Sequence, residues 1–174
     1  MLYIAFFVLL GAACVLGDAD KHPLYSFSPT VGSGSGTSYS LSGEGRVTGV
    51  RVWEANNNYI YGFQFRFGYI WSEVVGLKSG NSQEMQLSEG EAIIQLSGKY
   101  NHYIQSVVFT TSRGRTLQAG QPSGRSFNFY PEHSMAELCI ISGRYHGGIT
   151  ALGAHWAVIA DPYTNRNSNS TALW

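Results

Sequence analysis

Charged side chains are scarce in this sequence, and their signs balance. Only 13% of the 174 residues are Asp, Glu, Lys or Arg, and eleven basic side chains offset eleven acidic ones. Long helices usually rely on Glu, Lys and Ala, so this composition argues against a helical domain. Because the formal net charge is zero, no broad field would attract nucleic acid or an anionic membrane. We therefore expect no nucleic-acid partner.

Cysteine is almost absent, with Cys14 and Cys139 as the two residues of this type. Cys14 lies in the apolar run 2–16, which is too short to span a bilayer comfortably and is followed by small residues. We interpret residues 1–17 as a secretory signal peptide, with a buried N-terminal strand as the alternative, and expect no transmembrane segment. Cleavage would leave Cys139 as a single thiol. We expect it to be a buried small hydrophobic residue rather than a nucleophile or half of a disulfide.

Familiar catalytic motifs are missing as well. The stretch Gly32–Gly36 fits neither a nucleophile elbow nor a phosphate-binding loop, because its serines alternate with glycines and no Lys follows. The carboxylates fall mostly in or beside turns, and sequence alone pairs none of them at catalytic distance. The histidines are scattered without partnering cysteines, as His22, His102, His133, His146 and His155. We therefore expect no enzyme, no cofactor and no metal site.

Glycine and aromatic residues are abundant instead. The chain has 21 glycines, 14% aromatic residues and 44% hydrophobic residues, which favours many short strands joined by tight turns around one core. Apolar and polar residues alternate in 50–53 and again in 61–68, as in half-buried antiparallel strands. The three Asn residues at 56–58 suit the turn of a hairpin between them. The predicted class is all-β.

We divide the chain into a signal peptide at 1–17, a polar leader at 18–24, one domain at 25–159 and a tail at 160–174. The tail is rich in Asn and Ser, so we expect it to be disordered. It contains the sequon Asn169-Ser170-Thr171, which makes Asn169 a candidate glycosylation site.

A repeated pattern indicates three similar units. Residues 96–107 and 141–153 share a Ser-Gly pair, a basic residue, a Tyr and a later Ile in the same register, and 52–63 keeps the apolar anchors. The later isoleucines are Ile60, Ile104 and Ile149, which gives a period of about 45 residues. An even period of this kind predicts three supersecondary units around a pseudo-three-fold axis.

The alternation of apolar and polar residues, together with the turn residues between the runs, predicts strands in two of these units. The second unit is predicted to hold four strands, near 84–87, 92–96, 104–110 and 116–119. The third unit is predicted to begin at Ser126 and to continue through 137–141 and 150–159.

The expected loops carry glycine, aromatic and amide groups. The glycine-rich stretch 31–38 permits positive φ and close approach to a ligand, with a flexible linker as the alternative. Such loops suit carbohydrate, because aromatic rings pack against the C–H face of a sugar while N–H groups donate to its hydroxyls. Tyr59, Tyr103 and Tyr145 fit this interpretation, and each also fits an ordinary hairpin aromatic.

Several motifs in order along the chain resemble jacalin-related lectins. They are Gly32-Ser33-Gly34-Ser35-Gly36, Val47-Thr48-Gly49-Val50-Arg51-Val52, Ser97-Gly98-Lys99-Tyr100, and Ile141-Ser142-Gly143-Arg144 followed by Leu152-Gly153-Ala154-His155-Trp156. The resemblance extends over about Tyr25 to Val158, and within the family it is strongest to the animal zymogen granule protein branch. It implies a β-prism of three four-stranded Greek-key sheets with pseudo-three-fold symmetry.

The resemblance also implies a function. Members of this branch are secreted, are stored in digestive or goblet-cell granules, and bind mannose-type glycans, proteoglycans or microbial surfaces. The expected partners are therefore glycans or glycoproteins, on mucin, proteoglycan or a microbial surface. Neither catalysis nor an obligatory metal is expected.

In this family the sugar lies between a glycine loop, here 34–37, and a binding loop, here 144–150, beside a recognition loop, here 99–103. The resemblance makes five backbone amides candidate hydrogen-bond donors, those of Ser35, Gly36, His146, Gly147 and Gly148. The candidate ligand-binding residues are Gly34, Ser35, Gly36, Lys99, Tyr103, Tyr145, His146, Gly147, Gly148 and Thr150.

One departure from the family pattern concerns the binding loop. Sugar-binding members have Gly, three residues and then Asp, and this pattern falls here on His146 to Thr150, with no Asp or Glu anywhere in 138–160. A Thr in place of the Asp removes charge-assisted hydrogen bonds worth roughly 1.5 to 3 kcal/mol each. The glycine loop departs too, with Ser35 at a usual Gly and Thr37 at a frequent Lys. We therefore predict a lectin with an altered sugar site; the alternative is a β-prism interaction protein of granules or mucus that binds no sugar.

Overall fold

The computed structural model describes residues 24–55 and 58–159. Every regular element in these residues is a strand, so the predicted all-β class is confirmed. The predicted signal peptide 1–17, most of the leader 18–24 and the tail 160–174 lie outside the described residues, together with Cys14, His22 and Asn169. In the described part, no helix is long and apolar enough to cross a membrane.

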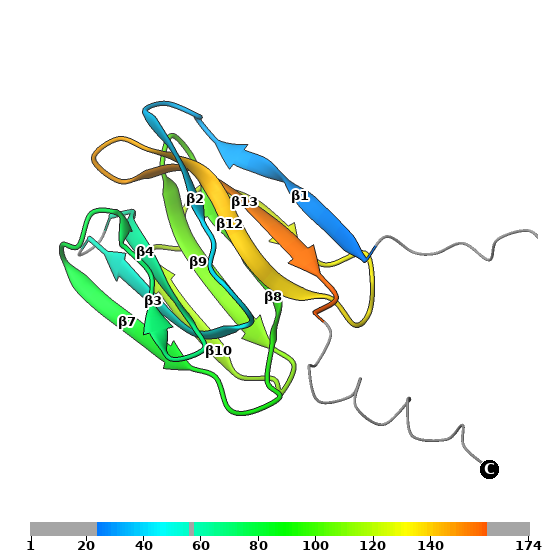
Figure 1. Ribbon diagram of the computed structural model, residues 1–174. Helices are drawn as coiled ribbons and strands as arrows, with labels where there is room; N and C mark the ends of the chain where they lie inside the picture. Colours follow the sequence, from blue (N-terminus) through cyan, green and yellow to red (C-terminus); the bar gives the residue numbers. More distant parts are fainter. Residues whose placement is uncertain (1–23, 56–57, 160–174) are drawn as a thin grey trace, which may run out of the picture.

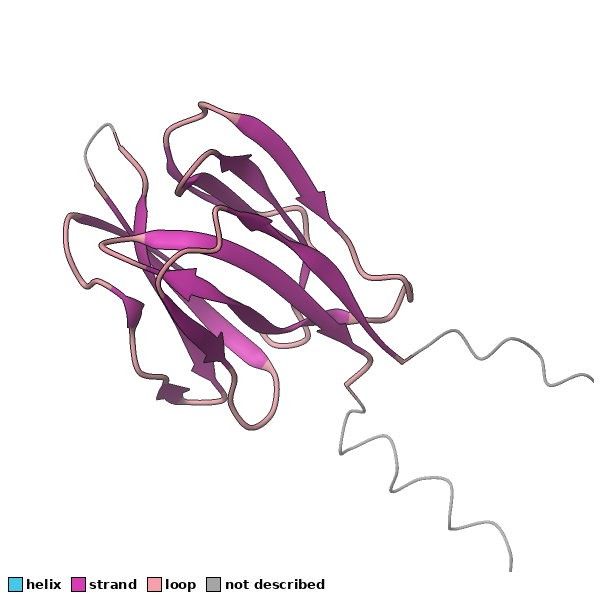
Figure 2. Ribbon diagram, turned by 90° about the horizontal axis from the view of Figure 1, so that it is seen from above, coloured by secondary structure: helices cyan, strands magenta, loops and turns pink. Residues whose placement is uncertain are grey.

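The strands form three antiparallel sheets around one hydrophobic core, and Figure 1 shows their arrangement. Figure 2 shows strands and loops only in the described part. The first sheet has the order β1 (Tyr25–Gly32), β13 (Ile149–Ala157), β12 (Glu137–Tyr145), β2 (Thr37–Leu41). The second has the order β10 (Thr116–Gly120), β9 (Ile104–Thr111), β8 (Ile93–Tyr100), β11 (Arg125–Phe129). The third has the order β5 (Ile70–Trp71), β4 (Ile60–Phe67), β3 (Val47–Glu54), β7 (Asn81–Gln86), with β6 (Val75–Gly76) also paired to β4.

The third sheet has a divided edge. Both β5 and β6 pair with the same edge of β4, so together they take the place of one edge strand. Between them, the Ser72 amide donates to Phe65 O at 2.8 Å, and the Phe65 amide donates to Ser72 Oγ at 3.2 Å. Ser72 thus keeps the backbone of β4 hydrogen-bonded across the break.

The predicted repeat corresponds to the central hairpins of the three sheets, β3–β4, β8–β9 and β12–β13. Ile60, Ile104 and Ile149 each begin the second strand of a hairpin, and each is fully buried. In all three hairpins the register shifts within the last two residues of the first strand. The repeat therefore reports a shared hairpin geometry, and the predicted β-prism is confirmed.

The predicted division into units was wrong at the sheet edges. Residues 84–87, expected in the second unit, overlap β7, which pairs with β3 of the third sheet. Ser126, expected to open the third unit, lies in β11, which pairs with β8 of the second sheet. The repeated pattern lies only in the central hairpins, so it carried no information about which sheet each flanking strand joins.

Aromatic side chains connect the sheets inside the core. Phe109 of the second sheet packs edge-on against Phe63 and Phe65 of the third, with ring centroids 6.2 and 6.1 Å apart. These rings are fully buried, and burial of such a side chain is worth about 1.5–3 kcal/mol. In the first sheet, buried Trp156 donates its Nε1 hydrogen to Ser28 Oγ at 3.0 Å, which satisfies the one polar group that the indole brings into the interior.

Cys139 is half-buried, so the expectation that it would be a buried small hydrophobic residue was wrong. The register of β12 against β13 shifts between Leu138 and Ile140, which takes Cys139 out of the regular alternation of a strand. Its Sγ lies 3.3 Å from His155 O, and partial burial raises the pKa of the thiol. The thiol is therefore held in its protonated, unreactive form at neutral pH.

Candidate functional site

The loops of the three central hairpins meet at one end of the prism, which we call the hairpin end (Figure 1). Tyr59, at the end of the β3–β4 loop, stacks on Tyr103 of the β8–β9 loop, with centroids 3.9 Å apart and planes at 12°. The Tyr59 hydroxyl donates to Gly147 O of the β12–β13 loop at 3.3 Å. Burial, together with the neighbouring Tyr103, raises the pKa of Tyr59, so its hydroxyl stays protonated and available as a donor.

The repeat explains how these rings fit together. Tyr59, Tyr103 and Gly148 occupy equivalent positions in the three hairpins. Each immediately precedes the isoleucine that begins the second strand of its hairpin. A Cβ at Gly148 would lie 2.3 Å from the Tyr59 ring. The third copy therefore carries glycine where the first two carry tyrosine, and the missing side chain leaves room for the stacked pair.

The glycine loop between β1 and β2 is fixed against β13. The amides of Ser33 and Gly34 donate to Thr150 O at 2.9 and 3.4 Å. Gly32 has φ +108°, and a Cβ there would lie 2.1 Å from the same carbonyl, so only glycine allows this approach. The stretch is thus a tight loop held to the sheet, rather than a free linker.

The glycine loop also adjoins the binding loop. A Cβ at Gly36 would lie 2.2 Å from Tyr145 O and 2.7 Å from the His146 Cβ. Arg144 donates from Nη1 to Gly36 O at 3.0 Å. Within the described residues, the amides of Ser35 and Gly36 donate to no backbone or side-chain acceptor outside the strand ladders. The family resemblance made these two amides candidate donors to a ligand, and this stays a prediction.

Thr150 has a supporting position. Its side chain is fully buried, and its hydroxyl donates to Ser35 O at 2.5 Å. Thr150 therefore positions the glycine loop instead of facing solvent. An Asp could not make this contact when ionised, because a carboxylate only accepts hydrogen bonds.

The other predicted residues of the binding loop differ in exposure. His146 and Gly147 are exposed, Tyr145 is partly buried against the core, and Gly148 is buried beneath Tyr59. The His146 amide donates to Gly148 O at 2.8 Å and closes the turn. Of the expected donors in this loop, the His146 amide is thus already occupied, whereas its imidazole is open to solvent.

The recognition loop borders a small pocket. Asn101 and His102 are exposed, and the His102 ring packs edge-on against Tyr103 at 4.7 Å. A pocket of about 310 Å³ is lined by Gly32, Tyr100, Asn101, His102 and Arg125. Lys99 does not join this cluster, since its Nζ donates to Ser126 Oγ of β11 at 2.8 Å.

Sequence reasoning missed two contributors to the site. Arg125 is the first residue of β11, a strand that matches none of the quoted motifs, so nothing in the sequence signalled its role. Tyr59 was noticed as an aromatic residue but was not included among the candidate ligand-binding residues. Its alignment with Tyr103 in the repeat was the signal that could have placed it at the hairpin end.

Chemically, the hairpin end offers donors and aromatic surface, and the one carboxylate at the ends of its hairpin strands in the described part, that of Glu54 at the end of β3, already accepts from the Gly120 amide. The donors are the amides of Ser35 and Gly36 beside the exposed His146, and Asn101 and Arg125 at the 310 Å³ pocket, while the Tyr59–Tyr103 stack supplies the aromatic surface. Among the described residues, no group of three His, Cys, Asp or Glu side chains could hold a metal ion. Such a surface can bind a polyhydroxylated ligand by donating to its oxygens.

The fold and this site define a lectin-like domain, and the profile of the family "Jacalin-like lectin domain" matches residues 28–155. The chain belongs to this family. Over 161 residues it is 42% identical to human zymogen granule membrane protein 16, across 91% of this chain and 95% of the human protein.

Solved structures agree with this assignment. The crystal structure of a prostate-specific WGA16 glycoprotein lectin has a TM-score of 0.69 and 30% identity, covering 78% of this chain and all (100%) of that one. A mannose binding jacalin related lectin from Ananas comosus has a TM-score of 0.66 and 19% identity, over 77% of this chain and 98% of its own, and so supports the fold. The matching family and both of these solved structures are lectins by name.

Proposed function

We propose that this protein is a secreted, non-enzymatic lectin that binds glycans at the hairpin end through an altered site. The observation that carries the proposal is the glycine loop, which is pinned to Thr150 and leaves the amides of Ser35 and Gly36 free beside His146. The Tyr59–Tyr103 stack supplies apolar surface next to these donors. Backbone donors and a ring face are the groups that recognise a sugar.

The altered part of the site is the acceptor. The Ananas comosus lectin with the same fold is described as mannose binding. In this chain no carboxylate occurs in β12, β13 or the loop between them except Glu137, which is buried in an ion pair with Arg46. Two lost charge-assisted hydrogen bonds correspond to a loss of about a hundredfold or more in affinity. Glycans that accept hydrogen bonds from the amides, His146 and Arg125 are therefore favoured over simple mannosides.

A glycan array tests this proposal with wild type and Thr150→Asp. We expect wild type to bind a subset of complex glycans. Thr150→Asp should bind a different subset, because the new carboxylate accepts hydrogen bonds whereas the threonine hydroxyl donates one. Tyr130→Ala, an exposed aromatic position in the β11–β12 connection, serves as the control and should keep the wild-type pattern. An empty array for wild type, with mannose binding gained by Thr150→Asp, would contradict the lectin proposal.

That contradicting outcome would favour a second candidate, an interaction protein that uses the β-prism without binding sugar. The observation in its favour is that the Thr150 hydroxyl is already used by Ser35 O. Its partner would then be a protein of the granule or mucus, and binding to such a partner would survive removal of glycans by glycosidases.

We also propose that the chain is secreted after removal of residues 1–17 and associates with secretory granules. The name of the human relative supports granule association, and the apolar run 2–16 supports a signal peptide. Mucin, proteoglycan and microbial-surface glycans are the proposed partners. N-terminal sequencing of protein from the medium should begin near residue 18, and a glycosidase-sensitive mass shift that Asn169→Gln abolishes would establish glycosylation of the tail.

A further inference from the structure

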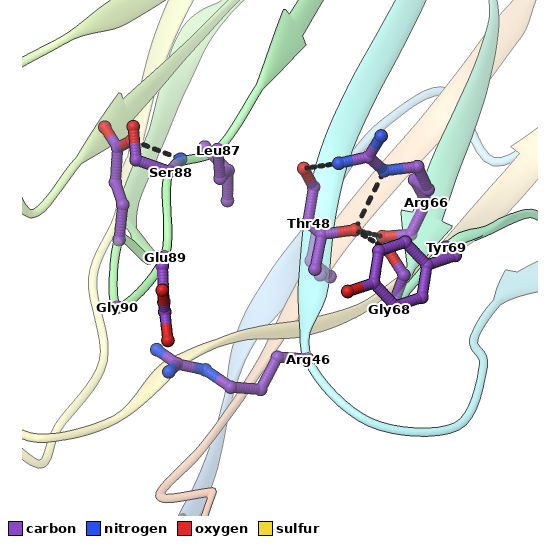
Figure 3. A pocket seen from close by; sticks show the side chains of 11 residues that line it. Arg46, Thr48, Arg66, Gly68, Tyr69, Leu87, Ser88, Glu89 and Gly90 are labelled. Atoms are coloured by element: carbon purple, nitrogen blue, oxygen red, sulfur yellow. Dashed lines mark hydrogen bonds between the residues drawn. The ribbon is translucent and has the colours of Figure 1, made fainter.

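A second pocket lies at the opposite end of the prism, which we call the turn end. Here β3 begins and β4 ends, whereas the hairpin loop joins their other ends. The pocket measures about 520 Å³. It lies between the turn that contains Gly68 and Tyr69 and the turn at Ser88–Gly90, as Figure 3 shows.

One wall of this pocket is anchored by a buried carboxylate. Glu91 is 3% exposed and accepts from the Ser88 amide at 2.9 Å and from Thr111 Oγ1 at 2.6 Å. Arg115 binds the same carboxylate through Nε at 2.9 Å and Nη2 at 2.6 Å. The turn that presents Glu89 is therefore fixed in place before any ligand arrives.

The facing wall is anchored by Thr48. Its Oγ1 donates to Gly68 O at 2.6 Å and accepts from Arg66 Nε at 3.0 Å, and Arg66 Nη2 donates to Thr48 O at 3.2 Å. Below the gap, Arg46 is held by Glu137 through contacts of 2.8 and 2.5 Å. Both walls and the floor are thus rigid.

Tyr69 has no role in the core. Its side chain is 98% exposed at the tip of the β4–β5 turn, so its removal costs the fold almost nothing. In Figure 3 its ring projects into the space between the turns, opposite Glu89, whose carboxylate points toward Arg46. Leu87 adds apolar surface to the same pocket.

We infer that the turn end is a second carbohydrate site, which takes a neutral saccharide. A sugar ring has an apolar C–H face and a rim of hydroxyls that both donate and accept. Tyr69 and Leu87 match the face, and the Glu89 carboxylate supplies an acceptor. Arg66 donates to Thr48 and, from Nη1 at 3.2 Å, to Gln86 Oε1, and the second N–H of Nη1 supplies a donor. Acidic and basic side chains, Glu89 and Glu91 against Arg46 and Arg66, line the same pocket, so it favours a neutral ligand over an ion of either sign.

Two sites at opposite ends would make one chain bivalent. A bivalent monomer can bridge two glycan chains without forming an oligomer, and it gains avidity on a dense glycan surface. The inference does not depend on the hairpin-end proposal, because no residue is shared between the two pockets.

Amide NMR of the full-length, nitrogen-15-labelled protein tests the inference. The probes are the methyl glycosides of mannose, glucose, galactose, fucose and N-acetylglucosamine, each titrated separately. At least one should cause saturable shifts at Gly68, Tyr69, Ser88 and Glu89. Tyr69→Ala should weaken this binding about tenfold, and Glu89→Gln should weaken it in the same direction.

Two matched variants complete the experiment. Tyr130→Ala removes another exposed tyrosine, and His146→Ala alters the hairpin end; both should leave the turn-end shifts unchanged. The inference is overturned if no probe gives saturable shifts at these amides, or if the shifts persist in Tyr69→Ala. Failure of the hairpin-end proposal would instead appear as absent shifts at Ser35 and Gly36 when a complex glycan selected on the array is titrated.

Discussion

At the hairpin end the loops are held by backbone hydrogen bonds and stacked rings, whereas at the turn end they are held by ion pairs. Thr150 O and the Tyr59–Tyr103 stack organise the first, and the Glu91–Arg115 pair, with an N–O distance of 2.6 Å, organises the second. Backbone contacts depend on local shape, so they respond to an added methyl group. Ion pairs depend on ionisation, so they respond to pH and to loss of a charge. Different perturbations should therefore destabilise the two ends: added side-chain volume at the hairpin end, and acid or loss of a charge at the turn end.

The largest expected effect is at the turn end. Glu91→Ala leaves Thr111 Oγ1 and the Ser88 amide without their acceptor, and leaves Arg115 with only Gln86 O, at 2.7 Å. This should lower the free energy of unfolding by roughly 3 kcal/mol. Glu89→Ala, two residues away in the same turn but exposed, should change it by less than about 0.5 kcal/mol. Urea titrations of both variants provide the comparison, and equal losses would contradict the assigned role of Glu91.

The same carboxylate should make stability depend on pH. Its hydrogen bonds with Arg115 hold the pKa of Glu91 well below its usual range. Because the folded pKa is depressed, the stabilisation is fully present above the unfolded value of about 4.3 and is lost as pH falls through the folded value. The stability difference between wild type and Glu91→Gln should therefore shrink progressively in urea titrations from pH 5 downward to about 2. A difference that stays constant over this range would rule out the linkage.

Substitution of two glycines in the glycine loop by alanine should destabilise the protein to different extents. Gly32→Ala places a Cβ 2.1 Å from Thr150 O, whereas the same change at Gly34 meets nothing within 4 Å. Both have positive φ, which costs an alanine about 1 kcal/mol, so Gly32→Ala should cost about 2 kcal/mol more than Gly34→Ala. Thermal unfolding of the pair measures this difference. Similar losses at both positions would mean that the loop is not pinned as described.

The smallest expected effect concerns the Thr150 hydroxyl. Thr150→Val keeps the shape of the side chain but removes the donor to Ser35 O, so stability should fall by about 1 kcal/mol. Glycan binding should weaken further, because the Ser35 and Gly36 amides lose their fixed direction. Thr110→Val, at a partly buried strand position of the second sheet, is the control and should leave binding unchanged. Unaltered glycan binding in Thr150→Val would show that the hydrogen bond that fixes the glycine loop is not needed for glycan recognition.

Much of the fold could be predicted because its signal is local and repeated. The even spacing of Ile60, Ile104 and Ile149 marks the three hairpins, and each isoleucine is buried at the start of a strand. The partners of β7 and β11 could not be predicted, because edge pairing depends on where the chain crosses between sheets. Cys139 was misjudged because a bulge interrupts the alternation on which its predicted burial rested.

The candidate site was predictable in its loops but not in its side-chain roles. The glycine loop and binding loop adjoin as the family resemblance implied. The burial of Thr150 could not be read from its position in the motif, since it depends on a hydrogen bond to a residue 115 positions away. Lys99 illustrates the same limit, because its partner Ser126 belongs to an edge strand.

Chemical-shift mapping at the hairpin end tests the central claim most directly. A glycan selected on the array is titrated into nitrogen-15-labelled wild type and into Gly32→Ala. The account predicts saturable shifts at the amides of Ser35 and Gly36 and at His146 in wild type, and weaker binding in the variant. Saturable binding that leaves Ser35, Gly36 and His146 unshifted would contradict it.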